Sequence, residues 1–308
     1  MQAHGMRFSR RAFLGGAAAC GAASMIPATG FGADAKPNSM FGGVQIGTIT
    51  YSFRSMKGDA ASVLSHTVAS GISSIELMGN TAEGFAGFPG GDAKDPEKAK
   101  AMLEWRLSTP MDKFEALREM YNDAGVGIHI VKFGDIGNKN LSDGQIDYYF
   151  RVAKALGAKC ITREISDEAT AKRIGPLADK HGIKVAFHNH EQINATTYDG
   201  PILSYGKNLA INLDIGHYVA ANEDSVLALV EKYRDRIFTL HLKDRKKNKG
   251  ANMPFGEGDT PVAEVLRFLK KEKLPIIGDI ELEYPVPKDS DAVKEVAKCV
   301  QFCKQALA

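Results

Sequence analysis

Short apolar runs alternate with amphipathic helical segments along the chain after residue 44. At several restarts a glycine separates the helical segment from the next apolar run, as in Ser70-Gly71-Ile72, Ala124-Gly125-Val126, Leu156-Gly157-Ala158 and His181-Gly182-Ile183. Glycine just past a helix end supplies the left-handed cap, and the apolar run after it is typical of a buried parallel strand. The pattern predicts eight strands, at residues 44–51, 72–78, 126–133, 158–165, 183–190, 209–215, 237–243 and 276–283.

Eight alternations of strand and helix favour a closed barrel, because doubly wound open sheets rarely repeat so evenly. We therefore predict an α/β fold, a single-domain (β/α)₈ TIM barrel. Two of its loops are long, at residues 79–110 and 244–261, and both lie on the side where barrel enzymes build active sites. The glycine-rich stretch 84–91 fits either a mobile lid with aromatic tips or an insertion without regular structure.

The first 35 residues differ from the rest and match an export signal. Arg10-Arg11 is typical of a twin-arginine leader, a run of small apolar residues extends to Ile26, and Ala33-Asp34-Ala35 supplies a cleavage site. The apolar run is shorter than the roughly 20 residues that span a bilayer, which favours a cleaved signal over a membrane anchor. We predict a twin-arginine (Tat) signal peptide at 1–35 and a barrel at 36–308. A periplasmic location, a contact with the Tat export machinery and no stable membrane insertion of the mature chain follow.

Removal of this leader makes the chain formally neutral. The full chain has a net charge of +2, and the leader contains Arg7, Arg10, Arg11 and Asp34. A neutral surface gives no reason to expect nucleic acid or an anionic membrane as a partner. The remaining cysteines are odd in number, Cys160, Cys299 and Cys303, and the last two stand one helical turn apart, which is poor geometry for a disulfide. We expect reduced thiols.

Polar side chains collect at the carboxyl ends of the last four predicted strands. The ends read Phe-His-Asn-His-Glu at 187–191, Leu-Asp-Ile-Gly-His at 213–217, Leu-His-Leu-Lys-Asp at 240–244 and Asp-Ile-Glu-Leu-Glu at 279–283. Side chains two residues apart on a strand share a face, so inward faces would bring together His188, Asp214, His241 and a glutamate of the last strand, Glu281 or Glu283. Two imidazoles and two carboxylates suit a divalent ion. A lone His at a strand end is more often structural, but four such ends in succession argue for a site.

These motifs, together with Phe-Gly-Glu-Gly-Asp at 255–259, resemble the xylose isomerase-like barrel superfamily over residues 44–307. That group includes sugar (phosphate) isomerases and epimerases, hydroxypyruvate isomerase, inosose dehydratase and endonuclease IV. The resemblance implies metal ligands at His188, Asp214, His241 and Glu281. Many members have Glu where this chain has His188, and in epimerases that Glu is one of two opposed acid/base groups. The difference favours isomerase or lyase chemistry.

Two neighbouring acids leave the ligand set open. Glu283 shares a face with Glu281, and is either the alternative ligand or a catalytic base. Glu164, which ends the strand at 158–165, is either the alternative first ligand in place of His188 or part of an outward salt bridge. The expected metal is Mn²⁺, with Zn²⁺, Fe²⁺, Co²⁺ or Mg²⁺ as alternatives.

The resemblance implies proton abstraction next to a carbonyl through an enediolate, assisted by the metal. Candidate bases are His190, His217 and Glu283, and Lys243 would steady an anionic intermediate or pair with a neighbouring acid. The glycine-rich loop at 255–259 resembles the segment that closes over the site in this family. Further candidate substrate contacts are His129, Lys132 and Arg163.

An exported enzyme is expected to act on an unphosphorylated sugar or keto-sugar, because phosphorylated intermediates are not normally metabolised in the periplasm. The first hypothesis is a sugar isomerase or epimerase, and its variant is a lyase or dehydratase acting by β-elimination on a 3-keto-glycoside or an inosose-like substrate. The second is a non-catalytic periplasmic carbohydrate-binding protein. An endonuclease IV-like nuclease would need more His ligands than the chain supplies. The resemblance also implies a homodimer.

Overall fold

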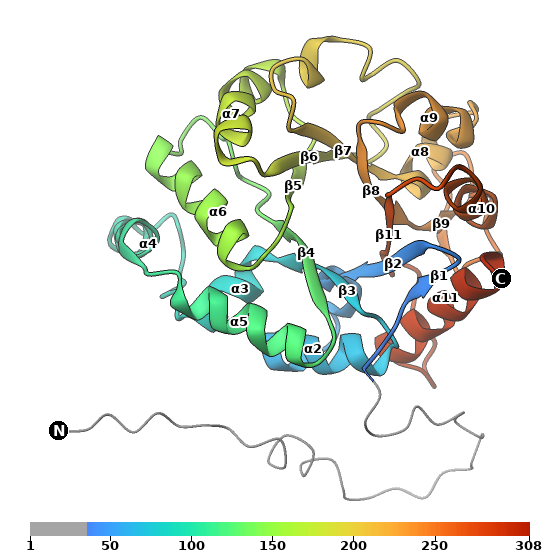
Figure 1. The fold of residues 1–308 in the computed structure, drawn as a ribbon, viewed down its shortest axis with the longest axis horizontal. Helices are drawn as coiled ribbons and strands as arrows, with labels where there is room; N and C mark the ends of the chain where they lie inside the picture. The colour runs from blue at the N-terminus through green and yellow to red at the C-terminus, as the bar shows by residue number, and fades with distance from the viewer. Residues whose placement is uncertain (1–35) are drawn as a thin grey trace, which may run out of the picture. The chain divides into compact units, whose positions relative to one another are not determined.

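The structure, a computed structural model, describes residues 36–308, and the predicted signal peptide at 1–35 lies outside the described residues. Eight parallel strands pair in chain order and close when the last pairs with the first. Figure 1 shows the strands at the centre with the helices around them. The strands are β2 (Val44–Ile49), β3 (Ser74–Met78), β4 (Gly127–Lys132), β5 (Cys160–Glu164), β6 (Lys184–His188), β7 (Leu209–Asp214), β8 (Ile237–Leu242) and β11 (Ile277–Ile280).

The predicted (β/α)₈ barrel is therefore confirmed, and each predicted strand is present. Several strands end earlier than predicted: β6 ends at His188 and β11 at Ile280, because the polar residues that follow leave the ladder and enter loops. Three further short strands lie outside the closed eight-strand barrel. β1 (Met40–Phe41) pairs with β2 in antiparallel fashion, and β9 (Asp244–Arg245) pairs with β10 (Asn252–Met253) in the loop after β8.

Most of the helices in the described part of the chain begin at side-chain caps that the sequence supplies. Ser142 and Gln145 form a reciprocal capping box at the start of α6 (Asp143–Ala155). Asp167 and Asp291 accept backbone N–H groups at the starts of α7 (Glu168–His181) and α11 (Ala292–Ala306). Single substitutions at such caps typically cost about 1 kcal/mol. The helices are α2 (Ala60–Ala69), α3 (Gly79–Ala86), α4 (Pro96–Ser108), α5 (Asp112–Asp123), α6 (Asp143–Ala155), α7 (Glu168–His181), α8 (Ile215–Ala221), α9 (Val226–Tyr233), α10 (Val262–Glu272) and α11 (Ala292–Ala306), with 3₁₀ turns at Thr50–Phe53 and Pro201–Leu203.

The long segment after β3 is more ordered than the sequence suggested. Residues 79–86 form α3, which ends at Gly87 in the left-handed conformation (φ +93°). Phe88 then packs against Trp105 of α4 with ring centroids 5.1 Å apart, and the guanidinium of Arg106 lies over the Phe88 ring, 4.9 Å from its centroid. The glycine-rich stretch is therefore not an irregular insertion along its full length, because residues 84–86 belong to α3 and Phe88 packs against Trp105. Its role as a lid stays a prediction.

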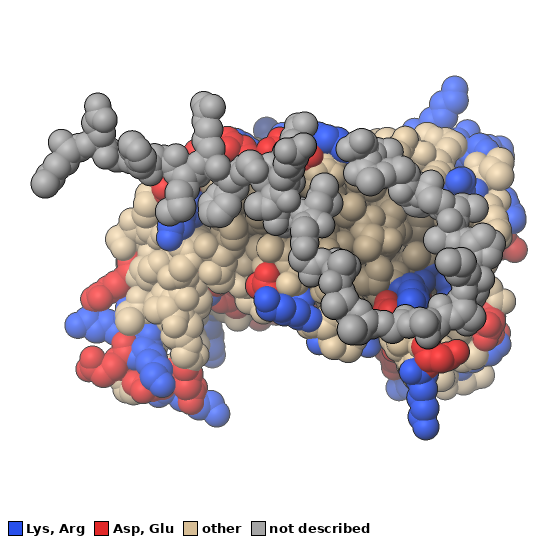
Figure 2. All heavy atoms as spheres, turned by 90° about the horizontal axis from the view of Figure 1, so that it is seen from below, with Lys and Arg blue, Asp and Glu red and all other residues tan. Residues whose placement is uncertain are grey.

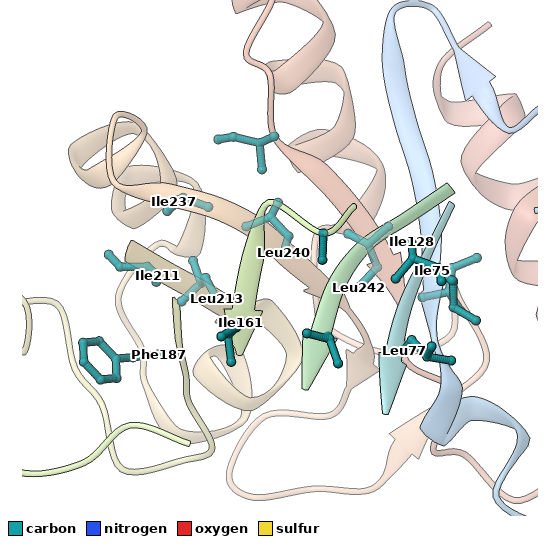
Figure 3. Packing of buried hydrophobic residues seen from close by; sticks show 14 of the residues in the cluster. Ile75, Leu77, Ile128, Ile161, Phe187, Ile211, Leu213, Ile237, Leu240 and Leu242 are labelled. Atoms are coloured by element: carbon teal, nitrogen blue, oxygen red, sulfur yellow. The ribbon is translucent and has the colours of Figure 1, made fainter. Parts of the chain in front are cut away.

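The main core lies between the strands and the helices. Figure 3 shows part of it, where Ile75, Leu77, Leu240 and Leu242 project from their strands. Burial of each such side chain stabilises the fold by about 1.5–3 kcal/mol. Inside the barrel a smaller cluster contains residues that are mostly small, namely Ile130, Cys160, Ala186 and Ala210.

A polar chain fills the interior at the amino ends of the strands. His129 Nδ1 lies 2.8 Å from Ser74 Oγ, His129 Nε2 lies 2.9 Å from Asp279 Oδ2, and Thr239 donates to the same carboxylate. The ladder between β3 and β4 shifts register beside Ile75 and Glu76, and this shift leaves His129 without a partner residue on β3. Since His129 lies early in β4 and does not line the cavity at the other end, the expectation that it contacts substrate is wrong.

Among residues 36–308, no helix combines the length and apolar character needed to cross a membrane. On the face drawn in Figure 2, Lys and Arg side chains are interspersed with Asp and Glu over the described surface. This mixture of charges agrees with the neutral balance expected for the barrel.

Candidate active site

Four polar side chains meet where β6, β7, β8 and β11 end. His188 and Asp214 are the last residues of β6 and β7, His241 is next to last in β8, and Glu281 directly follows β11. All four are buried, and one nitrogen or oxygen from each lies within 4.8 Å of the others. The structure therefore brings together the four residues that the strand-end pattern selected as metal ligands.

The donor set fits a divalent ion. His188 Nδ1 and Asp214 Oδ2 are buried without a hydrogen-bond partner among the described residues. Burial and the neighbouring His241 hold the pKa of His188 well below its usual value, so its imidazole is neutral and keeps a free lone pair. His241 Nδ1 lies 3.1 Å from Glu281 Oε2. Two ligand bonds of about 2.1 Å that meet at 90–109° place their donor atoms roughly 3.0–3.4 Å apart, so this spacing is compatible with a shared ion.

Lys243 lies against the same carboxylates. Its Nζ is 2.9 Å from Asp214 Oδ2, 2.9 Å from Glu281 Oε2 and 2.8 Å from Glu283 Oε2. Burial alone would lower the pKa of Lys243, but the three carboxylates raise it above its usual value, so the side chain carries a positive charge at neutral pH. Asp214 Oδ2 forms an ion pair with this ammonium, but the geometry is not that of a hydrogen bond. The oxygen therefore has a charged neighbour and no hydrogen-bond donor.

The same cation determines the state of Glu281. Burial would raise the pKa of this carboxyl group, but Lys243 and His241 together lower it well below its ordinary value. His241 responds in the opposite direction: burial would lower its pKa, while the carboxylates of Glu281 and Glu76 raise it to about 10. Without an ion these two groups form a charged, hydrogen-bonded pair, and an ion bound at His241 Nδ1 would displace the proton that this nitrogen carries.

His217 lies between two cations. Its Nε2 is 2.9 Å from Lys243 Nζ, and its Nδ1 is 2.8 Å from Arg245 Nη1. Burial and Lys243 lower its pKa to about 3, so the ring is neutral. A neutral imidazole has one accepting nitrogen, so it accepts a hydrogen bond from only one of the two cations. Such a weakly basic ring is a poor proton acceptor, and a role in substrate binding fits His217 better than that of a base.

The two other candidate bases lie nearer the solvent. His190 follows β6 with its side chain 57% exposed, and its Nε2 is 3.6 Å from Glu164 Oε2. Glu283 is partly buried and borders the cavity through the carboxylate that contacts Lys243. Glu164 also forms an ion pair with Lys132 at 2.8 Å. Together with His188 and His190, Glu164 forms a second group whose donor atoms lie within 4.8 Å of one another, so the alternative first ligand stays open.

A cavity of about 210 Å³ opens over these groups. Sites for drug-sized ligands usually have roughly 300–1,000 Å³, so this volume suits one small molecule. One wall is apolar and comes from the ends of β2 and β3, where Tyr51 is 40% exposed and Arg54 stacks over its ring at 4.6 Å. The cavity is lined by Ile49, Tyr51, Met78, Lys132, Glu164, His188, His190, His217, Lys243, Glu281 and Glu283.

Two expectations about neighbouring segments need correction. The guanidinium of Arg163 hydrogen-bonds the carbonyl oxygens of Ile136 and Glu164, and Arg163 does not line the cavity as a substrate contact would. The loop at 255–259 does not line it either. Asp244 fastens this loop by accepting backbone N–H groups of Gly256, Gly258 and Thr260, at 2.8, 2.9 and 3.1 Å.

Glu76 belongs to the site and was missed in the sequence. It lies in the middle of β3, is fully buried, and places Oε2 2.8 Å from His241 Nε2 across the barrel. Thr162 donates to its other oxygen, and Asn212 Nδ2 lies 3.4 Å from Oε2. The signal that could have found it is the lone acid between Ile75 and Leu77, because a carboxylate inside an apolar strand needs a buried partner.

Known proteins share this sequence profile and this barrel. The family described as "Xylose isomerase-like TIM barrel" matches residues 113–305, more than half of the chain. An inosose dehydratase from Clostridium beijerinckii is 30% identical over 122 residues, which cover 38% of this chain. The chain spans only about a third (35%) of the length of that relative in the match.

Solved structures show the same fold at low identity. The probable 3-DHS dehydratase AsbF from Bacillus anthracis gives a TM-score of 0.62 at 14% identity, covering 84% of this chain and 99% of that chain. The 3-keto-D-glucoside 4-epimerase YcjR from E. coli gives a TM-score of 0.59 at 13% identity, covering 85% and 99%. On the sequence match and the closed eight-strand barrel, the chain belongs to the xylose isomerase-like TIM barrel family.

Proposed function

We propose that this chain is a divalent-metal-dependent enzyme that removes a proton next to the carbonyl of an unphosphorylated sugar or keto-sugar. The observation that carries the proposal is the buried group of His188, Asp214, His241 and Glu281 at the floor of a small polar cavity. Enzymes with this barrel include proteins described as a dehydratase and as an epimerase, which supports an enzyme over a binding protein.

The four grouped residues would hold the ion, with Mn²⁺ as the first candidate. A bound divalent ion supplies Lewis acidity, which polarises a carbonyl and makes the neighbouring C–H group more acidic. Tyr51 and Met78 offer an apolar wall against which the carbon face of a small sugar can lie. The charged groups on the other wall would orient its hydroxyl groups by hydrogen bonds.

Glu283 is the proposed base. Its carboxylate borders the cavity, and the proton would pass from the carbon next to the carbonyl to a carboxylate oxygen of Glu283. The Lys243 ammonium, 2.8 Å from that carboxylate, would stabilise the negative charge that develops on the substrate oxygen. Isomerisation or epimerisation then returns a proton to carbon.

A lyase would share this first step. In β-elimination the electron pair left on carbon forms a double bond and expels a leaving group from the next carbon, and His190 at the mouth of the cavity could protonate that group. Two observations favour this second candidate: the partial match to an inosose dehydratase, and His188 at a position where a second carboxylate base would be expected in an epimerase.

Isotope exchange tests the shared step. We would incubate Mn²⁺-loaded protein in D₂O with free ketoses and 3-keto-glycosides and follow the carbons next to the carbonyl by NMR. The proposal predicts deuterium at one such carbon, and loss of exchange in Asp214→Asn and Glu283→Gln. Absence of exchange across a broad panel, combined with sugar binding that a chelator does not change, would instead support a non-catalytic carbohydrate-binding protein.

We also propose that the chain is exported to the periplasm by the Tat machinery, which is the reason for choosing unphosphorylated substrates. The support is the Arg10-Arg11 motif with its short apolar run and Ala33-Asp34-Ala35. Cell fractionation tests it: the full chain should appear in the periplasm without residues 1–35, and Arg10→Lys combined with Arg11→Lys should remain uncleaved in the cytoplasm. Cleavage that is unaffected by this change would contradict the proposal.

A further inference from the structure

Glu76 is a buried carboxylate that the proposed chemistry does not use. It is fully enclosed in the middle of β3, and it does not line the cavity, so it does not reach a substrate. Its Oε2 lies 2.8 Å from His241 Nε2, and Thr162 Oγ1 donates to its Oε1. A carboxylate is costly to bury, and a chain keeps one in a barrel interior only where hydrogen bonds and charge compensate for the loss of water.

His241 faces a different group with each of its ring nitrogens. Nε2 lies against Glu76, while Nδ1 lies 3.1 Å from Glu281 Oε2, on the side of the four grouped residues. A histidine that binds a metal through one nitrogen commonly donates the other N–H to a carboxylate, which fixes the tautomer and the ring orientation and strengthens the ligand. Glu76 lies where that carboxylate would be.

We infer that Glu76 is the positioning residue of the metal site: it accepts the Nε2–H of His241 and so presents Nδ1 to the ion. This inference rests on the proposed function. The neighbouring contacts support it, because Thr162 donates to one oxygen of Glu76, and Asn212 Nδ2 lies 3.4 Å from the other oxygen. Residues of β3, β5, β7 and β8 thus converge on one imidazole across the barrel.

A matched pair of variants separates this role from a general need for a buried charge. Glu83 is also a buried glutamate with a charged partner, Arg106 at 2.8 Å, but it lies in α3 away from the cavity. In the full-length protein, Glu76→Gln should weaken Mn²⁺ binding 10- to 100-fold, measured by competition with a chromophoric chelator. Glu83→Gln should leave Mn²⁺ affinity within twofold of the native value.

A second measurement needs no variant and does not depend on activity. NMR of the imidazole nitrogens in the native protein loaded with Zn²⁺ should show His241 protonated at Nε2 and without a proton at Nδ1. The opposite tautomer, or equal Mn²⁺ affinities of Glu76→Gln and the native protein, would overturn the inference while leaving the metal site intact. A native protein that binds neither Mn²⁺ nor Zn²⁺ would overturn the proposed function and this inference together.

Discussion

Replacement of Lys243 by Met removes an ammonium group that lies within 2.9 Å of three carboxylates. Two of these, Asp214 and Glu281, are proposed metal ligands. Removal of one partner of a buried ion pair typically costs about 3–5 kcal/mol, because the remaining charge is left without compensation. We therefore expect Lys243→Met to lower the free energy of unfolding by about 3–5 kcal/mol in the presence of a chelator.

Added Mn²⁺ should reverse part of this loss. An ion at 100 times its Kd stabilises a native protein by about 2.7 kcal/mol. In native protein the ion also meets the charge of Lys243, and a 1+ and a 2+ charge about 5 Å apart repel by about 7 kcal/mol at an effective dielectric constant of 20. Lys243 also pairs with Glu283, which offsets part of this repulsion, so we expect removal of the ammonium to strengthen Mn²⁺ binding by at least about 1.4 kcal/mol. That value corresponds to about tenfold tighter Mn²⁺ binding by the variant.

Urea unfolding with chelator and with Mn²⁺ measures both quantities. Lys232→Met is the matched control, because Lys232 pairs with Asp199 away from the cavity, with the two side chains 42% and 46% exposed. Such a pair contributes about 1 kcal/mol or less, so the control should lose little stability and gain from Mn²⁺ as the native protein does. An equal gain from Mn²⁺ in Lys243→Met and in the native protein would refute the idea that Lys243 and the ion share carboxylates.

Three further predictions concern the scaffold. Arg106→Met should lower the free energy of unfolding by about 3 kcal/mol, measured by urea unfolding, without changing Mn²⁺ affinity, because it leaves the buried Glu83 carboxylate without its cation. Gly258→Ala should cost about 1–3 kcal/mol in the same assay, since a Cβ there would overlap the Asp244 carboxylate. Burial raises the pKa of the Cys299 thiol to about 12 and that of Cys303 above its usual value. Cys20→Ser removes the one cysteine of residues 1–35. In this variant at pH 8, below these pKa values, a thiol reagent should react only after unfolding, and rapid labelling of the folded protein would contradict the buried placement.

The sequence predicted the barrel because its signals are local. Each strand is a short apolar run, and glycine caps such as Gly125 and Gly182 mark where helices end. The same regularity places the residues that end successive strands at one rim, which is why the strand-end pattern alone suffices to select His188, Asp214 and His241. Strand order in a parallel barrel follows chain order, so no long-range pairing had to be guessed.

The positions of Glu76, His129 and Arg163 were not predicted correctly, because they depend on contacts across the barrel or on strand register. Glu76 contacts His241 across the barrel interior, and no local pattern in β3 identifies His241 as its partner. His129 lies beside a register shift, towards the amino ends of the strands. The two-residue period of a strand does not predict such a shift. Arg163 follows Thr162 on β5, and which of two adjacent side chains points inward is fixed by register and not by residue type.

The central claim is that the ends of β6, β7 and β8, together with Glu281 after β11, form a divalent-metal site. Anomalous scattering from a crystal of the full-length protein grown with Mn²⁺ tests it most directly. We predict one manganese peak coordinated by His188, Asp214, His241 and Glu281. A peak held by Glu164 and His190 instead, or no peak in this cavity at saturating Mn²⁺, would contradict a metal site at these four residues.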